Sequence, residues 1–331
     1  MTDNATPMSI FITGATGALA RLLTRRLVVA GHIVTGMTLR ADGAKLVRAD
    51  GALPVFPDPY RAGELRSAMA IKKPSIVINL APMLANHVPY RPAPWDTRLL
   101  AEGTPALIEA AESFGIDYFL HSSYTFTQAT LDPAEERMAP LAPLIEAARV
   151  AERSVIDATV TASVLRFGFI YGPESVNLRT IYDAMRVGDF PPFGPHDREA
   201  HFIHLDDAIA TIMLALEKRP NDVAFDVVDD DPTSPPEFLM QFVDALGVRP
   251  PTNRSVQGRG LPTLKRRQQI ALMHLDTHVD NAEAKAQLGW TPRFPDFRSG
   301  IEDTLMTWRA QDDAATAIIV PGTKPADQLT D

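Results

Sequence analysis

The chain contains no cysteine among its 331 residues, and this absence excludes disulfide bonds, zinc–thiolate sites and thiol nucleophiles. It also lacks a strongly basic region. Asp and Glu number 41 against 32 Lys and Arg, the net charge is −9, and the longest basic run is Lys265-Arg266-Arg267. A protein surface that binds nucleic acid or an anionic membrane needs clustered Lys and Arg side chains. We therefore expect no nucleic-acid partner and no membrane partner.

Targeting and membrane-spanning patterns are missing as well. Residues 1–7 are polar and do not combine a basic segment with an apolar one, so they do not resemble a signal peptide. No apolar stretch approaches the ~20 residues that cross a bilayer. Hydrophobic residues make up 45% of the chain, enough to bury the core of one large domain or of two unequal ones. We expect a cytoplasmic protein.

The first half of the chain alternates short apolar runs with amphipathic runs. One face of residues 18–30 carries Leu19, Leu22, Leu23 and Leu27 at helical spacing, and Gly31 follows as a stop. The sequence predicts strands at residues 9–13, 32–39, 52–56, 75–80, 118–122 and 163–169, and further helices at 99–114 and 142–158. Strands separated by helices of this length indicate an α/β fold with a doubly wound parallel sheet, the Rossmann arrangement.

The alternation loosens after residue 170, and this change predicts the domain boundaries. Residues 7–170 form the expected nucleotide-binding Rossmann domain, and residues 198–228 are predicted to return to its sheet. Residues 171–197 and 229–311 contain Pro- and Gly-rich loops between short helical runs, so we expect a smaller C-terminal substrate lobe there. Residues 312–331 are mostly small and polar, and we expect a flexible tail.

A glycine-containing turn joins the first predicted strand to the first predicted helix. In Thr13-Gly14-Ala15-Thr16-Gly17-Ala18-Leu19-Ala20, Gly14 permits the tight turn, Gly17 allows the backbone to approach a pyrophosphate, and Ala20 allows close packing of helix on strand. The helix N-terminus adds free N–H groups and a positive dipole end. Strand, turn and helix in this order predict a dinucleotide site.

The end of the second predicted strand indicates which dinucleotide is bound. An acidic residue there would bind the ribose diol and repel a 2′-phosphate. This chain instead has Arg40, whose planar guanidinium suits a phosphate, with Lys45 beyond it. Asp42, two residues later, is acidic and would instead favour NAD(H). We expect NADP(H) as the cofactor, with NAD(H) less favoured.

Several segments together resemble the extended short-chain dehydrogenases/reductases, of the NAD(P)-dependent epimerase/dehydratase type. The resemblance covers nearly the whole chain and is carried by TGATGALA (13–20), PSIVINLAP (74–82), EGTPALIEAAESFGIDYFLHSS (102–123), LRFGFIYGP (165–173), FIHLDDAIATIMLAL (202–216) and LGWTPRF (288–294).

The resemblance implies a set of site residues. The pyrophosphate would be held by Gly14, Thr16, Gly17 and Leu19, the 2′-phosphate by Arg40 and the adenine by Asp58. The ribose and nicotinamide would be lined by Leu80, Ala81 and Pro82. Ser123 would orient the substrate, with Ser122 as the alternative.

The chain departs from that family at its proton donor, a Tyr followed four residues later by a Lys. The corresponding positions are Leu144 and Ala148, and no tyrosine of this chain has a lysine at that spacing. A replacement donor is needed for carbonyl chemistry, because an ordinary tyrosine titrates near pH 10. The candidates are Tyr124, Tyr171 and His87, each of which could instead be a packing or surface residue. The histidines show no metal-ligand spacing, so we predict no metal.

Three functions fit these observations. The first is an NADP(H)-dependent oxidoreductase that acts on a small carbonyl or alcohol substrate with a nonstandard proton donor. The second is a redox-neutral epimerase, dehydratase or lyase on the same scaffold, and the third is a non-catalytic NADP(H)-binding sensor. A small-molecule substrate is the expected partner, and the resemblance implies a homodimer. Retention of Ser123 and of the LRFGFIYGP segment favours an enzyme.

Overall fold

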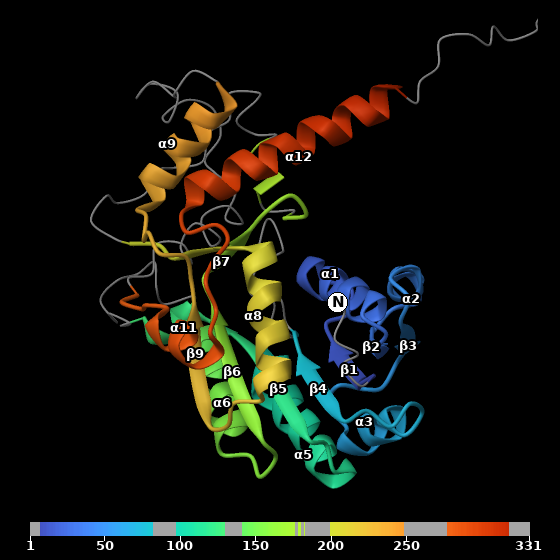
Figure 1. The fold of residues 1–331 in the computed structure, drawn as a ribbon. Helices are drawn as coiled ribbons and strands as arrows, with labels where there is room; N and C mark the ends of the chain where they lie inside the picture. Colours follow the sequence, from blue (N-terminus) through green and yellow to red (C-terminus); the bar gives the residue numbers. More distant parts are fainter. Residues whose placement is uncertain are drawn as a thin grey trace, which may run out of the picture.

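The fold was obtained as a computed structural model, which describes residues 7–81, 97–129, 141–175, 178–179, 182, 199–247 and 277–317. Its centre is a seven-stranded parallel sheet with the strand order β3-β2-β1-β4-β5-β6-β9 (Figure 1). The strands are β1 (Ser9–Thr13), β2 (Ile33–Met37), β3 (Leu53–Val55), β4 (Ile76–Asn79), β5 (Tyr118–Tyr124), β6 (Ala162–Phe167) and β9 (Val223–Val227). The doubly wound α/β fold expected from the sequence is confirmed.

Helices cover both faces of this sheet. On one face, α1 (Ala18–Val29), α2 (Ala41–Ala49) and α8 (Leu205–Lys218) pack on the side chains of Ile10, Ile12, Ile76 and Ile78. On the other face, α3 (Ala62–Met69), α5 (Thr104–Phe114) and α6 (Ala142–Ile156) pack on Phe11, Val77 and Phe119. Because both faces are buried, the central strands are mostly apolar, as parallel strands usually are, and their buried polar residues lie toward their carboxyl ends.

A second group of elements lies beyond the carboxyl ends of β6 and β9 (Figure 1). A small parallel sheet pairs β7 (Phe169–Tyr171) with β8 (Phe202–His204), and α9 (Pro235–Leu246) packs there with α12 (Phe297–Ala317). The short helix α11 (Ala282–Leu288) lies against β9. The core of this group is aromatic and includes Phe202, Phe238 and Phe297.

One part of the expected domain organisation differs. Residues 198–228 were expected to return to the main sheet, and β9 does so, but β8 pairs with β7 instead. The backbone separates from β6 at Gly168, where a Cβ would lie 2.6 Å from the carbonyl oxygen of His201. That contact brings β7 beside β8 and away from β6. Helix α12 continues to Ala317, so it includes the start of the expected tail.

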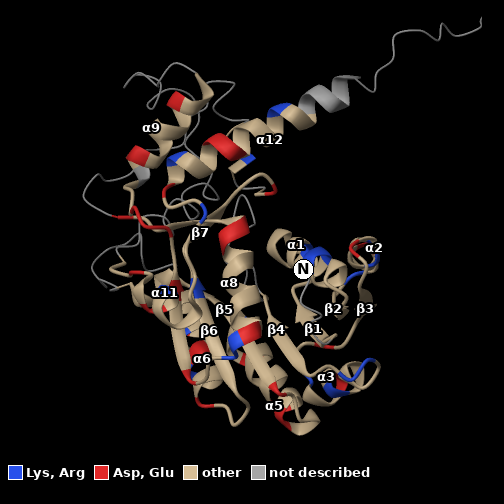
Figure 2. Cartoon of the chain, viewed as in Figure 1, with Lys and Arg blue, Asp and Glu red and all other residues tan. Residues whose placement is uncertain are grey.

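Positions of Lys and Arg alternate with positions of Asp and Glu along the described chain (Figure 2). Helix α8 carries Asp206 and Glu217 together with Lys218, and α12 carries Arg298 and Arg309 together with Glu302. In the described part of the chain, no helix has the length and apolar character needed to cross a membrane. Nor do three or more His, Asp or Glu side chains of the described residues come together as a metal site.

Candidate functional site

The glycine turn lies where the strand order reverses, between β1 and β4. Gly14 has φ +63°, and a Cβ at this position would lie 2.6 Å from the carbonyl oxygen of Leu80. Glycine is therefore required both by the left-handed backbone conformation and by the close approach of Leu80, the residue that follows β4. Gly17 then begins α1 with extended dihedral angles and no side-chain cap, so the first-turn N–H groups have no side-chain acceptor at the helix start.

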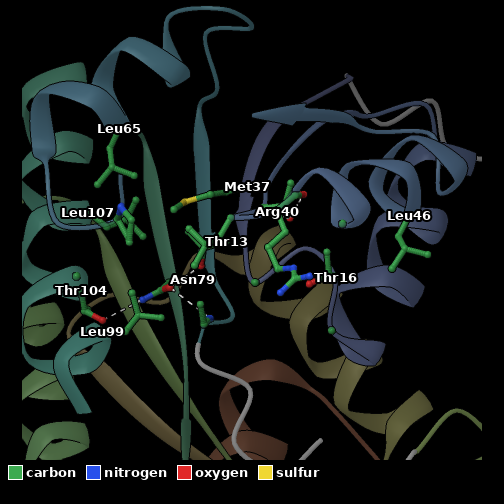
Figure 3. A pocket seen from close by; sticks show the side chains of 18 of the residues that line it. Thr13, Thr16, Met37, Arg40, Leu46, Leu65, Asn79, Leu99, Thr104 and Leu107 are labelled. Atoms are coloured by element: carbon green, nitrogen blue, oxygen red, sulfur yellow. Dashed lines mark hydrogen bonds between the residues drawn. The ribbon is translucent and has the colours of Figure 1, made fainter. Parts of the chain in front are cut away.

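A pocket of about 780 Å³ opens at this turn. Thr13, Gly14, Thr16 and Gly17 of the turn line it, together with Asn79 and Ala81 from the end of β4. Figure 3 shows Leu65, Leu99 and Leu107 on one side of the pocket and Thr16, Arg40 and Leu46 on the other. The π-helical turn η2 (Leu99–Gly103) adds Leu99 and Gly103 to the apolar side. An apolar wall beside a glycine turn suits an aromatic base joined to a pyrophosphate.

The cationic end of the pocket is formed by Arg40 and Lys45 around the start of α2. The Arg40 side chain is 81% exposed and its Nε lies 3.1 Å from Asp42 Oδ1. The hydrogen bond from Arg40 lowers the pKa of the Asp42 carboxyl. Because this ion pair is on the surface, its contribution to stability is small, and Arg40 can exchange Asp42 for another anion.

Asp58 organises the loop before α3 and is not itself among the residues that line the pocket. Its Oδ1 accepts a hydrogen bond from the backbone N–H of Tyr60 at 2.9 Å, and its Oδ2 lies 3.3 Å from Arg61 Nε. The next residue, Pro59, lines the pocket. Leu19 and Leu80, which the resemblance assigns to cofactor binding, have fully buried side chains, so only their backbone atoms could meet a ligand.

A buried polar row begins at the pocket and crosses the carboxyl ends of the strands. Thr13 Oγ1 donates to Asn79 Oδ1 at 2.6 Å, and Asn79 Nδ2 lies 3.3 Å from Thr104 Oγ1 and 3.0 Å from His121 Nδ1. Thr13 Oγ1 also accepts from the backbone N–H of Leu80 at 3.2 Å. These bonds fix the end of β4 against the glycine turn. Burial lowers the pKa of His121 to about 4, so its imidazole is neutral at physiological pH.

The row continues with a cluster of charged groups around Ser123, which we call the Glu152 cluster: Ser123, Thr127, Glu152, Arg166 and Asp226. Ser123 Oγ donates to Glu152 Oε1 at 2.5 Å, and Thr127 Oγ1 donates to the same oxygen at 2.9 Å. Arg166 donates to Glu152 Oε2 through Nε at 2.9 Å and through Nη2 at 2.8 Å. Arg166 Nη1 lies 3.8 Å from Asp226 Oδ1, and burial raises the pKa of Asp226 to about 6.

Sequence reasoning found Ser123 but missed Glu152, its partner. Register explains the rest of the cluster, because Ser123 pairs with Arg166 and Arg166 pairs with Asp226 across β5, β6 and β9. The signal in the sequence was a glutamate on the apolar face of α6. Among the buried residues of that helix, Glu152 is the only charged one.

The two positions that resemble the missing proton donor and its lysine are apolar in the structure. Leu144 and Ala148 are buried on α6 and pack with Tyr124 and Phe126. The rings of Tyr124 and Phe126 are stacked, with centroids 4.8 Å apart and planes 7° apart. Tyr124 is therefore the phenol that the fold brings to these positions.

The other candidate residues lie elsewhere. Tyr171 is fully buried, and its hydroxyl donates to the carbonyl oxygen of Asp296 at 3.2 Å. It lies within the aromatic core of the second group of elements. Burial raises the pKa of Tyr171. The buried Oγ of Ser122 has no hydrogen-bond partner among the described residues. Pro82 and His87 lie outside the described residues.

Comparison with known proteins agrees with this geometry. The sequence model of the NAD dependent epimerase/dehydratase family matches residues 10–228. The chain is 28% identical over 308 residues to a 3-diazoavenalumate denitrifying reductase of Streptomyces sp, which covers 89% of this chain and 99% of the relative. It is 22% identical over 324 residues to a UDP-glucose 4-epimerase of Mycolicibacterium smegmatis, covering 91% and 99% of the two chains.

Solved structures show the same fold. The Bordetella bronchiseptica enzyme WbmG in complex with NAD superposes with a TM-score of 0.72 at 21% identity, covering 94% of this chain and 96% of WbmG. This likeness extends over both groups of elements described above.

Proposed function

Because the chain belongs to the NAD dependent epimerase/dehydratase family, we propose that it is an NADP(H)-dependent oxidoreductase of the extended short-chain type. Its substrate is a small molecule with a polarised, reducible carbon such as that of a carbonyl group, or the corresponding reduced compound. The family and the named relatives are enzymes, which supports catalysis over a purely sensory role.

The observation that carries this proposal is the glycine-lined pocket with a cationic end. A Cβ at Gly14 would fill the space beside Leu80, and the first turn of α1 offers N–H groups. Arg40 and Lys45 line the same pocket and would bind a 2′-phosphate. When bound, the dinucleotide supplies or accepts a hydride at its nicotinamide ring.

The remaining residues have proposed roles at the other end of that ligand. Leu80, Ala81 and Pro82 follow β4 and would line the ribose and nicotinamide. Ser123 stands at the carboxyl end of β5, the edge at which doubly wound sheets bind their ligands, and would contact the substrate. Tyr124 and His87 remain the candidates for a polar contact to the reacting group.

Net reduction is favoured over a redox-neutral reaction. An epimerase must return a proton as well as a hydride, and a carbonyl reductase must also deliver a proton, whereas the positions resembling the family's proton donor are Leu144 and Ala148. The missing donor therefore favours net reduction of a substrate that takes up a hydride alone. The relative with the higher identity is named a reductase and, by its name, acts on a diazo compound. Hydride transfer to a diazonium cation replaces that group by hydrogen and releases dinitrogen without taking up a proton, so in this form the reaction needs no acid at the site.

Calorimetric titration with all four pyridine nucleotides tests the cofactor assignment. We expect NADPH and NADP⁺ to bind more tightly than NADH and NAD⁺. We expect Arg40→Glu to lower the affinity for NADPH by about 10-fold or more, because the attraction between the guanidinium and the 2′-phosphate is replaced by repulsion. Arg48→Glu is the matched control, because Arg48 lies on α2, the helix that follows Arg40, and is not among the residues that line the pocket. Unchanged preference in Arg40→Glu would contradict the NADP(H) assignment.

Stoichiometric consumption of NADPH tests the reaction type. With a panel of small carbonyl, imine and diazo compounds, one NADPH oxidised per product supports the reductase. Turnover of a sugar nucleotide without net oxidation would instead support the epimerase. Binding of NADPH with no turnover of any compound would contradict both.

A further inference from the structure

The pocket beside the glycine turn has a charged end and an apolar side. Among the residues that the structure describes, its charged lining residues are Arg40, Asp42 and Lys45, all at the start of α2. Figure 3 shows a group of apolar side chains on the side away from Arg40. Together with two neighbours from β2 and the loop after β3, this apolar side consists of Met37, Pro59, Leu65, Leu99 and Leu107. A dinucleotide whose phosphates bind at the glycine turn and at α2 would place its base against these residues, because a purine ring gains free energy by burial against aliphatic groups.

The loop that brings Pro59 to the pocket uses its N–H groups internally. The backbone N–H of Asp58 donates to Glu64 Oε2 at 2.9 Å, and that of Tyr60 donates to Asp58 Oδ1 at 2.9 Å. The backbone N–H of Arg61 donates to the carbonyl oxygen of Asp58 at 3.2 Å, and Pro59 has no N–H. Residues 58–61 therefore present no unused backbone donor to the ring nitrogens of a base.

The carboxylate of Asp58 is engaged in the same loop. Its Oδ1 accepts from the N–H of Tyr60, and its Oδ2 lies 3.3 Å from Arg61 Nε. Asp58 does not line the pocket. The acceptor that would bind the exocyclic amine of adenine is thus held by other donors.

The polar groups that line the pocket next to Leu99 are satisfied by each other. Asn79 Nδ2 lies 3.3 Å from Thr104 Oγ1 and 3.0 Å from His121 Nδ1, and Asn79 Oδ1 accepts from Thr13 Oγ1 at 2.6 Å. An amide has two N–H donors, and both are used here. The Asn79 amide therefore fixes the end of β4 and has no N–H left for a ligand.

The sequence neighbours of Pro59 and Leu99 also contact one another. The guanidinium carbon of Arg98 lies 4.0 Å from the centroid of the Tyr60 ring, and Arg98 Nε lies 2.8 Å from Glu102 Oε2. None of these three side chains lines the pocket. The contact joins the loop before α3 to η2 and leaves the apolar side chains of both segments facing the pocket.

We propose that the pocket holds the base of its dinucleotide by apolar contact and makes no selective hydrogen bond to the edge of the base, so that it accepts purines other than adenine, such as hypoxanthine. This inference rests on the NADP(H) site proposed above and broadens the class of ligand that the site takes. Selectivity then comes from the sugar–phosphate part of the ligand, through the glycine turn, Arg40 and Lys45. The contact between Asp58 and adenine that the family resemblance implies is not needed.

Two dinucleotides that differ only in the base test the proposal. The whole protein is titrated calorimetrically with NADPH and with deamino-NADPH, in which hypoxanthine replaces adenine. An oxygen then takes the place of the exocyclic amine and N1 gains a proton, so donor and acceptor on this edge exchange places. We expect the two dissociation constants to agree within about threefold, whereas a site that hydrogen-bonds this edge would lose about 10-fold or more. A dissociation constant for deamino-NADPH more than threefold above that for NADPH would overturn the proposal.

A variant of the apolar side tests what holds the base. We expect Leu99→Ala to lower the affinity for both dinucleotides about fivefold and to leave their ratio unchanged, because the lost contact is with the ring and not with its edge. Leu53→Ala is the matched control, since Leu53 is a partly exposed leucine of β3 outside the pocket lining. Wild-type affinity for both ligands in a folded Leu99→Ala variant would overturn the proposal. If this variant does not fold, the two dinucleotides still decide on the wild-type protein.

Asp58→Asn separates this inference from the contact that the resemblance implies. We expect the ratio of the two affinities to stay within about twofold of the wild-type ratio. A selective loss of NADPH affinity would show that Asp58 binds the amine of adenine and would overturn the proposal.

The same titrations separate this inference from the proposed function. If the wild-type protein binds neither dinucleotide, the proposed function fails. If it binds NADPH but binds deamino-NADPH more than threefold more weakly, only the inference fails. Arg40→Glu should weaken both ligands equally, because both carry the 2′-phosphate, and unequal weakening would count against the inference alone.

Discussion

Gly14 shapes the site because glycine has no Cβ. Its left-handed φ and the 2.6 Å distance from a built Cβ to the carbonyl oxygen of Leu80 both exclude a side chain. We predict that Gly14→Ala separates the glycine turn from β4 and weakens NADPH binding at least about 10-fold, with about 1–3 kcal/mol of lost stability from the strained backbone. NADPH fluorescence and urea unfolding would measure the two effects. Gly63→Ala is a suitable control, since a Cβ there meets nothing within 4 Å. Wild-type NADPH affinity in Gly14→Ala would contradict this account.

Tyr171 fits two interpretations of the sequence, as a proton donor or as a packing residue. It was a candidate proton donor, but its hydroxyl donates to the carbonyl oxygen of Asp296 inside an aromatic core. We therefore predict that Tyr171→Phe lowers stability by about 0.5–1.5 kcal/mol, the net value of one hydrogen bond, and leaves kcat within about twofold of wild type. Denaturant unfolding and steady-state NADPH oxidation are the measurements. A large loss of kcat in a folded Tyr171→Phe variant would restore its catalytic role.

At the scale of elements, α8 is fastened to the segment before α12 by one buried carboxylate. Asp207 accepts hydrogen bonds from the backbone N–H groups of Arg293 at 2.7 Å and Phe294 at 2.9 Å. We predict that Asp207→Asn costs about 1–3 kcal/mol, because its amide can accept from one N–H but faces the other with a donor. The neighbouring Asp206, whose ion pairs with Arg26 and Arg293 are partly exposed, provides the control, and Asp206→Asn should cost less than about 1 kcal/mol. Equal losses in urea unfolding would show that Asp207 is no special link.

The elements that could be predicted are those with local signals. Apolar runs and helical periodicity placed β1, α1, β4 and α6 to within a few residues, and the glycine turn placed the site at the end of β1. The pairing of β8 with β7 could not be foreseen, because it depends on the close approach of Gly168 to a strand far along the chain. Likewise, the role of Asp207 could not be foreseen, because its hydrogen-bond partners lie more than 80 residues further along the chain.

In the candidate site as well, local features could be predicted from the sequence and contacts between distant segments could not. The residues lining the glycine turn follow from sequence order, since strand, turn and helix are contiguous. The partners of Ser123 do not, because Glu152 and Arg166 come from α6 and β6 and meet Ser123 only through the packing of that helix on the sheet. The sequence therefore showed that a proton donor was missing, whereas the structure showed which charges lie near Ser123.

At the scale of the whole molecule, the order of the strands brings polar residues that are far apart in the sequence to the same edge of the sheet. Thr13, Asn79 and His121 are register partners on β1, β4 and β5, and Ser123, Arg166 and Asp226 are register partners on β5, β6 and β9. The hydrogen bonds that begin at the glycine turn end at His121, whose Nε2 has no partner among the described residues, and Ser123 of the Glu152 cluster follows two residues later on β5. Buried polar rows of this kind require every group to be satisfied or neutral, so the protonation of buried carboxyl groups bears on global stability.

Asp229, which follows β9, is the buried carboxyl group with the clearest consequence for stability. Its side chain is 3% exposed, and burial raises its pKa from 3.8 to about 8. Between these values the folded protein keeps a proton that the unfolded chain has released. Stability must therefore fall as the pH rises from about 4 to about 8, by at most about 1.4 kcal/mol per pH unit from this group, and level off above. At pH 8 the cost of keeping this group buried is fully present.

Asp229→Asn tests this argument, because the amide resembles the protonated acid and does not titrate. We predict that the variant is more stable than the wild type at pH 8, and that its free energy of unfolding declines less between pH 5 and pH 8. Urea unfolding at each pH unit in that interval is the measurement, with the exposed Asp231→Asn as control for the charge change alone. Parallel pH profiles for wild type and Asp229→Asn would mean that Asp229 titrates at the same pH in the folded and unfolded states, in which case burial does not keep its carboxyl protonated.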